Sequence, residues 1–236
     1  MNNKNIVIKI GGSLLFDKNK QINSKKITEF CDLVKENKNY DAIIIIVGGG
    51  IIAREYLNFI RKYTQNEALA DLVGIYFSQI NAKLLISYFK DLAYPLVPKN
   101  IDELSVALLS KKIIIMGGLQ PGQSTTSVAL EVAEFIKAKQ TIILTNVNGI
   151  YNKDPKKHKD AKLLEHLNYS ELSEIILKES DINQAAAGEY RIFDAVSLQI
   201  LKRSHLKVQI GSGLDLSKFQ ELWLGNIQNI GTVISD

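Results

Sequence analysis

The sequence has little of the chemistry that marks a secreted or metal-binding protein. Its single cysteine, Cys31, rules out an internal disulfide and fits a reducing cytosol. Cys31 falls at the apolar spacing of an expected helix, so we interpret the thiol as core filling rather than as a nucleophile. The three histidines, His158, His166 and His205, stand apart in the chain. We therefore predict no protein-built metal site and three surface histidines.

Blocks of one charge and long apolar runs are scarce as well. The 29 basic and 25 acidic residues give a net charge of +4 and are spread along the chain, which argues against a nucleic-acid partner. No apolar stretch reaches the ~18 residues of a membrane span, and the N-terminus shows no signal-peptide pattern. We expect a cytoplasmic protein that binds neither nucleic acid nor membrane.

The composition and periodicity that are present predict an α/β protein. With 236 residues, 46% of them hydrophobic, the chain can bury a sizeable core. The isoleucine run in 42–47 is typical of a parallel strand buried on both faces. Further strands are predicted at 5–10, 96–97, 113–116, 141–145, 207–210 and 232–234, and helices at 24–38, 51–63, 66–91, 102–109, after residue 124, at 169–177 and at 194–202.

We predict a single α/β domain, a three-layer αβα sandwich around a mainly parallel sheet. The stretch 152–162 carries basic residues and a proline without periodicity, which indicates an exposed loop. A looser join near this loop divides the domain into two lobes, about residues 1–140 and 141–236.

Nine of the fifteen glycines lie where predicted strands end. They stand in Gly11-Gly12, in Gly48-Gly49-Gly50, in the loop 117–122 and at Gly149. Glycine lets a backbone turn sharply or lets another group approach closely. Ligands of an open α/β sheet lie outside the carboxyl ends of its strands. We therefore expect one site assembled from four distant parts of the chain.

The loop from Gly117 to Thr126 joins a buried strand to a helix. Its hydroxyl-rich end, Ser124-Thr125-Thr126, is typical of a helix start. Free N–H groups and the helix dipole make such a place suitable for an anion, above all a phosphate. The alternative is an ordinary surface turn.

Two basic residues lie close to the glycine turns in the sequence: Lys9 before the first turn and Arg54 after the second. Lys9 ends a strand just before Gly11, where its ammonium can reach phosphate oxygens; the alternative is a solvated lysine. Arg54 lies one helical turn beyond Gly50 and can fold back toward an anion, or it can pair with Glu55. The spacing of a P-loop is absent.

Two acidic residues, Asp71 and Asp154, can each be interpreted as structural or as functional. Asp71 lies in an apolar stretch, where an unpaired carboxylate is costly, and it could cap a helix. Asp154 precedes Pro155, which holds it extended, and on sequence alone an ordinary turn is the simpler interpretation.

The glycine motifs resemble, in order and spacing, those of the amino acid kinase superfamily. The resemblance covers residues 5–236 and rests on Lys9 to Ser13, the three glycines 48–50, the loop 118–125 and the stretch 145–155. The Pro121-Gly122-Gln123 loop and the stretches around Asp71 and Asn81 look specifically like archaeal-type uridylate kinases.

The resemblance implies roles for the matching residues. It implies catalysis by Lys9 and Arg54. The positions that it implies for ATP are Lys9, Gly11, Gly12, Ser13, Gly50, Arg54, Thr145, Asn146, Tyr151 and Asp154. Those that it implies for UMP are Gly49, Asp71 (to the ribose hydroxyls), Leu119, Gln120, Pro121, Gly122, Gln123, Ser124 and Thr125.

The activity that the resemblance implies is transfer of the γ-phosphoryl group of ATP to UMP, with Mg²⁺ bound mainly by the phosphates. It also implies a homo-oligomer, a hexamer in the family, and UTP as a possible feedback inhibitor. Asn148 departs from the usual aspartate of the family, which removes a charge but keeps the turn chemistry. The run 184–188 matches only approximately, and no role is carried over from it.

Two other functions stay open. An isopentenyl phosphate kinase shares the glycine motifs but grips its acceptor with a histidine in the first half of the chain, and this sequence has none before His158. A nucleotide-binding storage or sensor protein of the same superfamily would bind ATP without transferring phosphate to a nucleotide.

Overall fold

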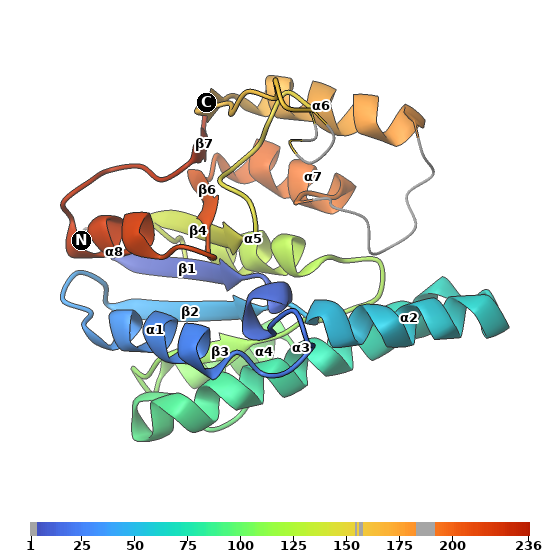
Figure 1. Ribbon diagram of the computed structural model, residues 1–236. Coiled ribbons are helices and arrows are strands. Elements are labelled where there is room, and N and C mark those ends of the chain that lie inside the picture. The colour runs from blue at the N-terminus through green and yellow to red at the C-terminus, as the bar shows by residue number, and fades with distance from the viewer. Residues whose placement is uncertain (1–3, 154, 156–157, 183–191) are drawn as a thin grey trace.

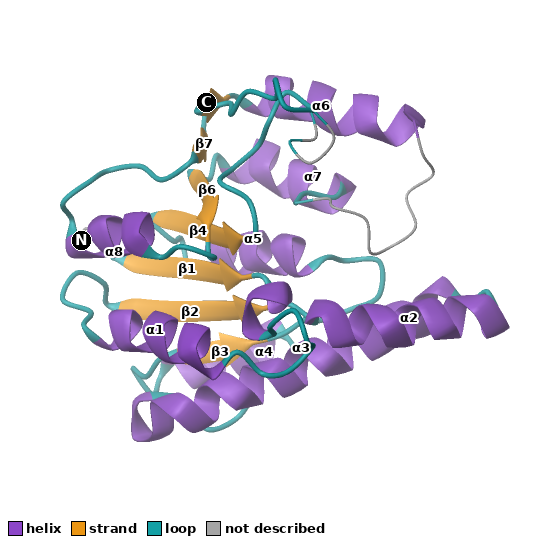
Figure 2. Ribbon diagram, viewed as in Figure 1, coloured by secondary structure: helices purple, strands orange, loops and turns teal. Residues whose placement is uncertain are grey.

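The computed structural model describes residues 4–153, 155, 158–182 and 192–236, and a single mixed sheet runs through the described part (Figures 1 and 2). The strands stand in the order β3-β2-β1-β4-β6-β7-β5. Their bounds are β1 Asn5–Ile10, β2 Ala42–Val47, β3 Ile114–Met116, β4 Gln140–Thr145, β5 His166–Leu167, β6 Val208–Ser212 and β7 Thr232–Ile234.

The central strands are parallel. β1 pairs with β2 on one side and with β4 on the other, β2 pairs with β3, and β4 pairs with β6, all in parallel register. Only the far edge changes direction, because β7 runs antiparallel to β6. The isoleucines of β2 are buried on both faces, as the sequence predicted. The chain fills one side of β1 first and then crosses to the other, so β1 and β4 flank the switch point of the sheet.

Helices cover both faces of this sheet (Figure 1). Side chains of α1, α3 and α8 share one core with Ile6, Ile8 and Ile10 of β1, and those of α4, α5 and α7 share the other with Val7. α2 packs on α3. The helix bounds are α1 Ser24–Lys35, α2 Gly50–Thr64, α3 Glu67–Phe89, α4 Ile101–Leu108, α5 Thr125–Phe135, α6 Tyr169–Ile182, α7 Ala195–Ser204 and α8 Ser217–Leu224, with short 3-10 turns η1 Gly12–Leu15 and η2 Lys90–Leu92.

Short polar side chains begin most of these helices. Asn23, Asn66, Asn100, Ser124 and Asp194 each accept a hydrogen bond from a backbone N–H in the first turn of α1, α3, α4, α5 and α7. Such a cap satisfies a donor that has no partner within the helix. The helix starts are therefore encoded locally.

α3 is the longest helix, and it is apolar on most of its circumference. By length and hydropathy alone, the stretch Glu67–Leu92 could cross a bilayer, with 33% of the window buried inside the protein. Its inner side chains, such as Leu85 and Phe89, belong to the core beneath the sheet, and Asp71 and Lys83 lie along it. These are features of a core helix with an uncovered outer face.

The predicted fold class is confirmed, and some element predictions are wrong. Residues 96–97 form no strand, because Pro95 and Pro98 beside them lack N–H donors; the neighbouring Ala93 instead makes an isolated bridge to Ile113. The sequence pattern did not predict β5, α8 or η1, which have two, eight and four residues. The histidines are exposed and Cys31 is buried, as predicted.

Candidate functional site

Four strand exits meet at one edge of the sheet. β3, β2, β1 and β4 are neighbours and parallel, so their carboxyl ends lie side by side. The loops that follow these strands carry the glycine motifs of the sequence. The structure therefore brings together the four stretches that were predicted to form one site.

The turns after β1 and β2 touch through their backbones. A methyl group at Gly12 would overlap the carbonyl oxygen of Gly48 and the nitrogen of Gly50. Gly50 has a φ of +83°, a conformation that favours glycine, and a methyl group there would lie 2.7 Å from the Gly12 carbonyl oxygen. No other residue type fits this contact, so two loops 36 residues apart in sequence form one surface of bare backbone.

The backbone after β2 has the geometry of an anion-binding nest. Gly49 is right-handed, with φ −69° and ψ −31°, and Gly50 follows with positive φ. Alternation of this kind turns successive N–H groups toward a common point. Within the described residues, no partner accepts from the N–H groups of Gly49 and Gly50, and both lie at the N-terminus of α2. An anion bound here gains these donors and the helix dipole.

Lys9 lies in the middle of the sheet, paired in register with Ile46 and Ile143. By alternation along β1 it shares a face with Val7, the face that α5 covers. Burial lowers the pKa of its ammonium from the ordinary 10.5 to about 8. A partly desolvated cation at this edge interacts strongly with a phosphate.

Arg54 projects from the first turns of α2 and is exposed. The alternative pairing with Glu55 does not occur, because Glu55 forms an ion pair with Lys20. Among the described residues Arg54 has no hydrogen bond or ion pair, so its guanidinium is free to reach a ligand.

The loop from Gly117 to Thr126 is held from beneath by α3. Gly118 donates its N–H to Ser78 Oγ at 2.7 Å, and Gly122 donates to Asp71 Oδ2 at 2.8 Å. Asp71 therefore does not cap a helix; Asn66 caps α3. The other members of the predicted acceptor site, Leu119, Gln120, Pro121, Gln123, Ser124 and Thr125, line the same loop, with Gln120 and Pro121 exposed.

The side-chain amide of Gln123 is hydrogen-bonded to other described residues through its nitrogen but not through its oxygen. Its amide nitrogen donates to Glu131 Oε2 at 2.5 Å, so one of the two N–H donors of the amide is used within the protein. Its amide oxygen is buried and has no hydrogen-bond partner within the described residues. A buried unpaired acceptor is costly. It marks a place where a donor group of a ligand would be satisfied.

The N-terminus of α5 already holds an anion of the chain itself. Asp194 accepts from Ser124 N at 2.9 Å and from Ser127 Oγ at 2.5 Å, and it also caps α7 through Ser197 N at 2.7 Å. Burial would raise the pKa of this carboxyl, but the hydrogen bonds from Ser127, Ser197 and Ser124 outweigh it, so the pKa lies below the usual value. A ligand anion at this terminus therefore stays a prediction, with Ser124 N and Ser127 Oγ already bonded to Asp194, whereas the N–H groups of Gly49 and Gly50 before α2 have no acceptor among the described residues.

On the other side of β1, the stretch after β4 is fixed by the last strand. Thr145 ends β4, Asn146 follows it, and Tyr151 makes a bridge to Leu163. Between them, Ile150 donates its N–H to the buried Thr232 Oγ1 at 2.8 Å. Asp154 lies outside the described residues, as does the run 184–188.

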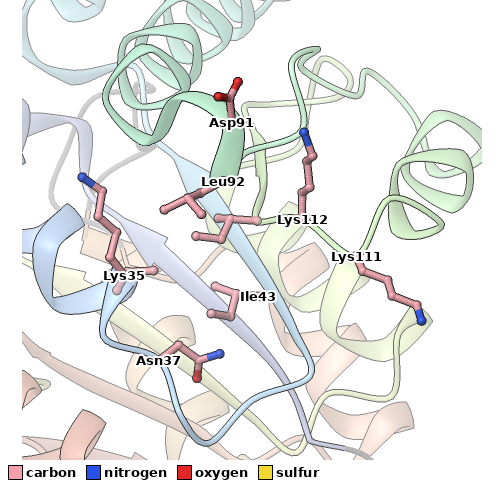
Figure 3. Close-up of a pocket in the computed structure, with 9 residues that line it drawn as sticks. Lys35, Asn37, Ile43, Asp91, Leu92, Lys111 and Lys112 are labelled. Atoms are coloured by element: carbon pink, nitrogen blue, oxygen red, sulfur yellow. The ribbon is translucent and has the colours of Figure 1, made fainter.

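A hollow of about 270 Å³ lies far from this edge, between α1, the turn after α3 and the start of β3. Lys35, Lys111 and Lys112 line it, but their ammonium groups point in three different directions (Figure 3). Lys35 lies over the ring of Tyr88. Without converging cations, this hollow does not compete with the glycine loops as an anion site.

The sequence match agrees with this geometry. The amino acid kinase family model matches residues 4–212. The chain belongs to the amino acid kinase family. The uridylate kinase of Methanobrevibacter smithii is 41% identical over 210 residues, which cover 89% of this chain and 90% of that protein. The uridylate kinase of Sulfolobus acidocaldarius is 38% identical over 229 residues, 97% of this chain and 98% of that protein.

A solved structure shows the same likeness in three dimensions. The uridylate kinase of Archaeoglobus fulgidus superposes with a TM-score of 0.78 at 31% identity, covering 98% of this chain and 99% of that one.

Several residues that hold the loops of the candidate site were not predicted from the sequence. Ser78 and Thr232 hold its loops, and Asp194 joins the starts of two helices. Only Asp194 left a sequence signal: with Ser197 three residues later it forms a capping box before an apolar helix pattern. That signal indicates a helix start but not the second helix that shares the carboxylate.

Proposed function

We propose that this chain is a uridylate kinase that transfers the γ-phosphoryl group of ATP to UMP, giving ADP and UDP. The observation that carries the proposal is the joint backbone surface of Gly12, Gly48 and Gly50 beside Lys9 at the switch point of the sheet. It offers N–H donors and a cation to two phosphate-bearing molecules at once. The named relatives and the solved neighbour support the choice of UMP as acceptor.

The acceptor in this reaction is already an anion, so the chemistry requires no general base. Catalysis then depends on alignment and on cancelling the repulsion between the donor and acceptor phosphates. Lys9, Arg54 and the N–H groups of Gly49 and Gly50 supply positive charge and donors. Asp71 and the loop 119–125 bind the nucleoside of UMP, and Gly11, Gly12, Ser13, Thr145, Asn146, Tyr151 and Asp154 bind ATP.

Magnesium enters this proposal as a partner of ATP. Among the described residues, no group of three His, Cys, Asp or Glu side chains could hold a metal ion. Mg²⁺ in such enzymes is held largely by substrate phosphates and water, which fits an edge built from N–H donors and cations. When bound, the ion neutralises phosphate charge; the chain's own residues orient the two substrates.

We also propose a homo-oligomer, with a hexamer as the arrangement that the family resemblance implies, and UTP as a candidate feedback inhibitor. Tyr76 and Ile80 on the outer face of α3 are 52% and 60% exposed, as Tyr56, Phe59 and Tyr63 on α2 also are to a similar degree. A helix that is apolar all round is stabilised when both faces are covered. A cytoplasmic location stays a prediction.

The test of the function is an acceptor panel with ATP and Mg²⁺. UMP should exceed isopentenyl phosphate in kcat/KM by roughly 10² to 10⁴-fold, because an isoprenoid leaves two or three polar groups of the loop unpaired at ~1–3 kcal/mol each. Equal turnover of isopentenyl phosphate, carbamate or acetylglutamate would overturn the assignment. Binding of ATP without transfer to any acceptor would favour a storage or sensor protein.

The same panel tests the acceptor loop. We propose that uracil is contacted by the exposed Gln120 amide and by the Gln123 oxygen, which has no partner among the described residues, while one Gln123 N–H stays bonded to Glu131. Gln120→Ala with Gln123→Ala should narrow the gap between the two acceptors mainly by lowering kcat/KM for UMP. Unchanged discrimination would place recognition of the base elsewhere.

A further inference from the structure

Side chains on the inner side of α3 form hydrogen bonds with two loops of the candidate site, the loop after β3 and the loop after β2. Ser78 holds the loop after β3 through the Gly118 N–H, and Asn81, three residues later on the same side of the helix, reaches the loop after β2. The Asn81 amide nitrogen donates to Gly48 O at 2.8 Å and to Gly49 O at 3.0 Å. Asn81 is only 4% exposed, so both bonds are made away from bulk water.

The two hydrogen bonds from Asn81 set the direction in which the N–H groups of Gly49 and Gly50 point. In a planar trans peptide the C=O and N–H groups point in opposite directions. The Gly48 carbonyl belongs to the same peptide as the Gly49 N–H, and the Gly49 carbonyl to the same peptide as the Gly50 N–H. Because Asn81 draws both carbonyls toward α3, the two N–H groups face away from α3. The Gly50 nitrogen there lies against Gly12 of the β1 turn.

Glycine peptides need such a restraint more than others. Gly48, Gly49 and Gly50 have no side chains to hinder rotation of the two peptides, and glycine loses the most conformational freedom when it is fixed. The loop has one further anchor on its N-terminal side, the bond from Gly48 N to Ile10 O at 3.1 Å. One asparagine with two donors therefore fixes the two peptides that form the nest.

We propose that Asn81 is a positioning residue for phosphate: it pre-orients the Gly49 and Gly50 N–H groups toward the place where the phosphate of UMP meets the γ-phosphate of ATP. The inference rests on the proposed function for the identity of the ligands. It requires no contact between Asn81 and the substrate. The advantage is entropic. The two peptides are already fixed in the folded protein before the substrate arrives, so substrate binding does not have to order them.

The test compares UMP with uridine, which differ only in the phosphate. Asn81→Leu removes both donors without adding charge, and Asn81→Asp removes them in an isosteric side chain. Isothermal titration should show UMP affinity falling about 10- to 100-fold in both variants, with uridine affinity unchanged, and kcat should fall by a similar factor. Asn81→Ser, which keeps one donor in a smaller side chain, should lose less.

Leu85→Ala is the matched control. Leu85 lies one turn further along the same side of α3 and is fully buried in the core, but no loop hydrogen bond depends on it. It should lower the Tm and leave the ratio of UMP to uridine affinity as in the wild type. If Leu85→Ala shifts this ratio as Asn81→Leu does, or if Asn81→Leu weakens uridine and UMP equally, Asn81 is merely a core residue and the proposal fails.

The two hypotheses fail separately. Wild-type protein that never phosphorylates UMP would overturn the proposed function, and ATP against adenosine would then test the nest in the same way. Wild-type protein that phosphorylates UMP, combined with an Asn81→Leu variant of wild-type kcat and UMP affinity, would overturn the role of Asn81 alone.

Discussion

At the scale of single residues, Lys9 shows how a proposed catalytic position can oppose stability. Its ammonium is desolvated between β2 and β4, and burial lowers its pKa from 10.5 to about 8. This difference corresponds to about 3 kcal/mol of unfavourable burial of the charged form at neutral pH. A bound phosphate would offset that cost, so the burial of this charge favours ligand binding.

Lys9→Met is expected to stabilise the free protein while disabling it. The kcat should fall on the order of 10²-fold or more, because the cation acts on charge that moves between phosphates, and UMP affinity should fall less. The free energy of unfolding at pH 7 should rise by up to about 3 kcal/mol. Steady-state kinetics and urea denaturation measure the two effects, and the exposed Lys25→Met serves as the control. A variant with near-native kcat would remove Lys9 from the mechanism.

The stability gain should also depend on pH with a definite sign. The folded pKa of about 8 lies below the unfolded value, so between about pH 8 and 10.5 the unfolded chain binds more protons than the folded one. Stability of the wild type relative to Lys9→Met should therefore rise with pH across this window. The difference should be constant below about 8 and close by about 10.5. A flat difference throughout would show that Lys9 is well solvated.

Asp71 accepts a hydrogen bond from the Gly122 N–H and is also proposed to bind the ribose of UMP. One substitution tests both roles. Asp71→Asn keeps an acceptor oxygen for the Gly122 N–H but loses the charge that strengthens the bond. We expect KM for UMP to rise about 10-fold, as suits a loss of about 1.4 kcal/mol, and KM for ATP to stay unchanged. Equal increases in both KM values would argue against a role confined to the acceptor.

At the scale of elements, one carboxylate joins two helices from different halves of the chain. Asp194 caps α7 by sequence and α5 by tertiary contact, through Ser124 N and Ser127 Oγ. Because α5 begins where the acceptor loop ends, the shared carboxylate fixes this loop against the second half. Each cap contributes about 1 kcal/mol in ordinary helices.

Asp194→Asn should destabilise the protein by about 2 kcal/mol at neutral pH, since two helices lose a charged cap. The folded pKa of Asp194 is below the unfolded 3.8, so this stability is present above about 3.8 and is lost as the pH falls through the folded pKa. Denaturation of both proteins at several pH values checks the prediction. A difference that persists undiminished in strong acid would mean that the charge is not what stabilises these caps.

At the scale of the whole molecule, α3 has two faces with different tasks. Its inner face holds the loops through Ser78 and Asn81 and packs on the sheet, whereas its outer face exposes Tyr76 and Ile80. Burial of apolar surface is the main driving force for association, so this outer face is where we expect a second copy.

Ile80→Glu should shift the protein toward monomers, because a carboxylate at an apolar interface loses its hydration without gaining a partner. Analytical ultracentrifugation at several concentrations measures the change, and Leu224→Glu on the exposed end of α8 provides a control of the same chemistry. A wild-type protein that sediments as a monomer, or an Ile80→Glu protein with the wild-type mass, would contradict this prediction.

The sequence by itself determined the order of the main strands and helices, and the helix caps and strand exits, because these depend on local patterns. Isoleucine runs mark strands buried on both faces, and Asn66 or Ser124 marks a helix start within a few residues. The fold class followed from the alternation of strand and helix patterns, and the family resemblance followed from the order and spacing of the glycine turns.

Only the tertiary structure decided which groups the chain keeps for itself and which it leaves for a ligand. The Asp194 carboxylate occupies the start of α5, Glu131 takes the Gln123 nitrogen, and Asn81 turns the Gly49 and Gly50 N–H groups outward. These partners lie between 8 and 70 residues apart in the chain. Their contacts depend on how helices pack across the sheet, and no local sequence pattern records that packing.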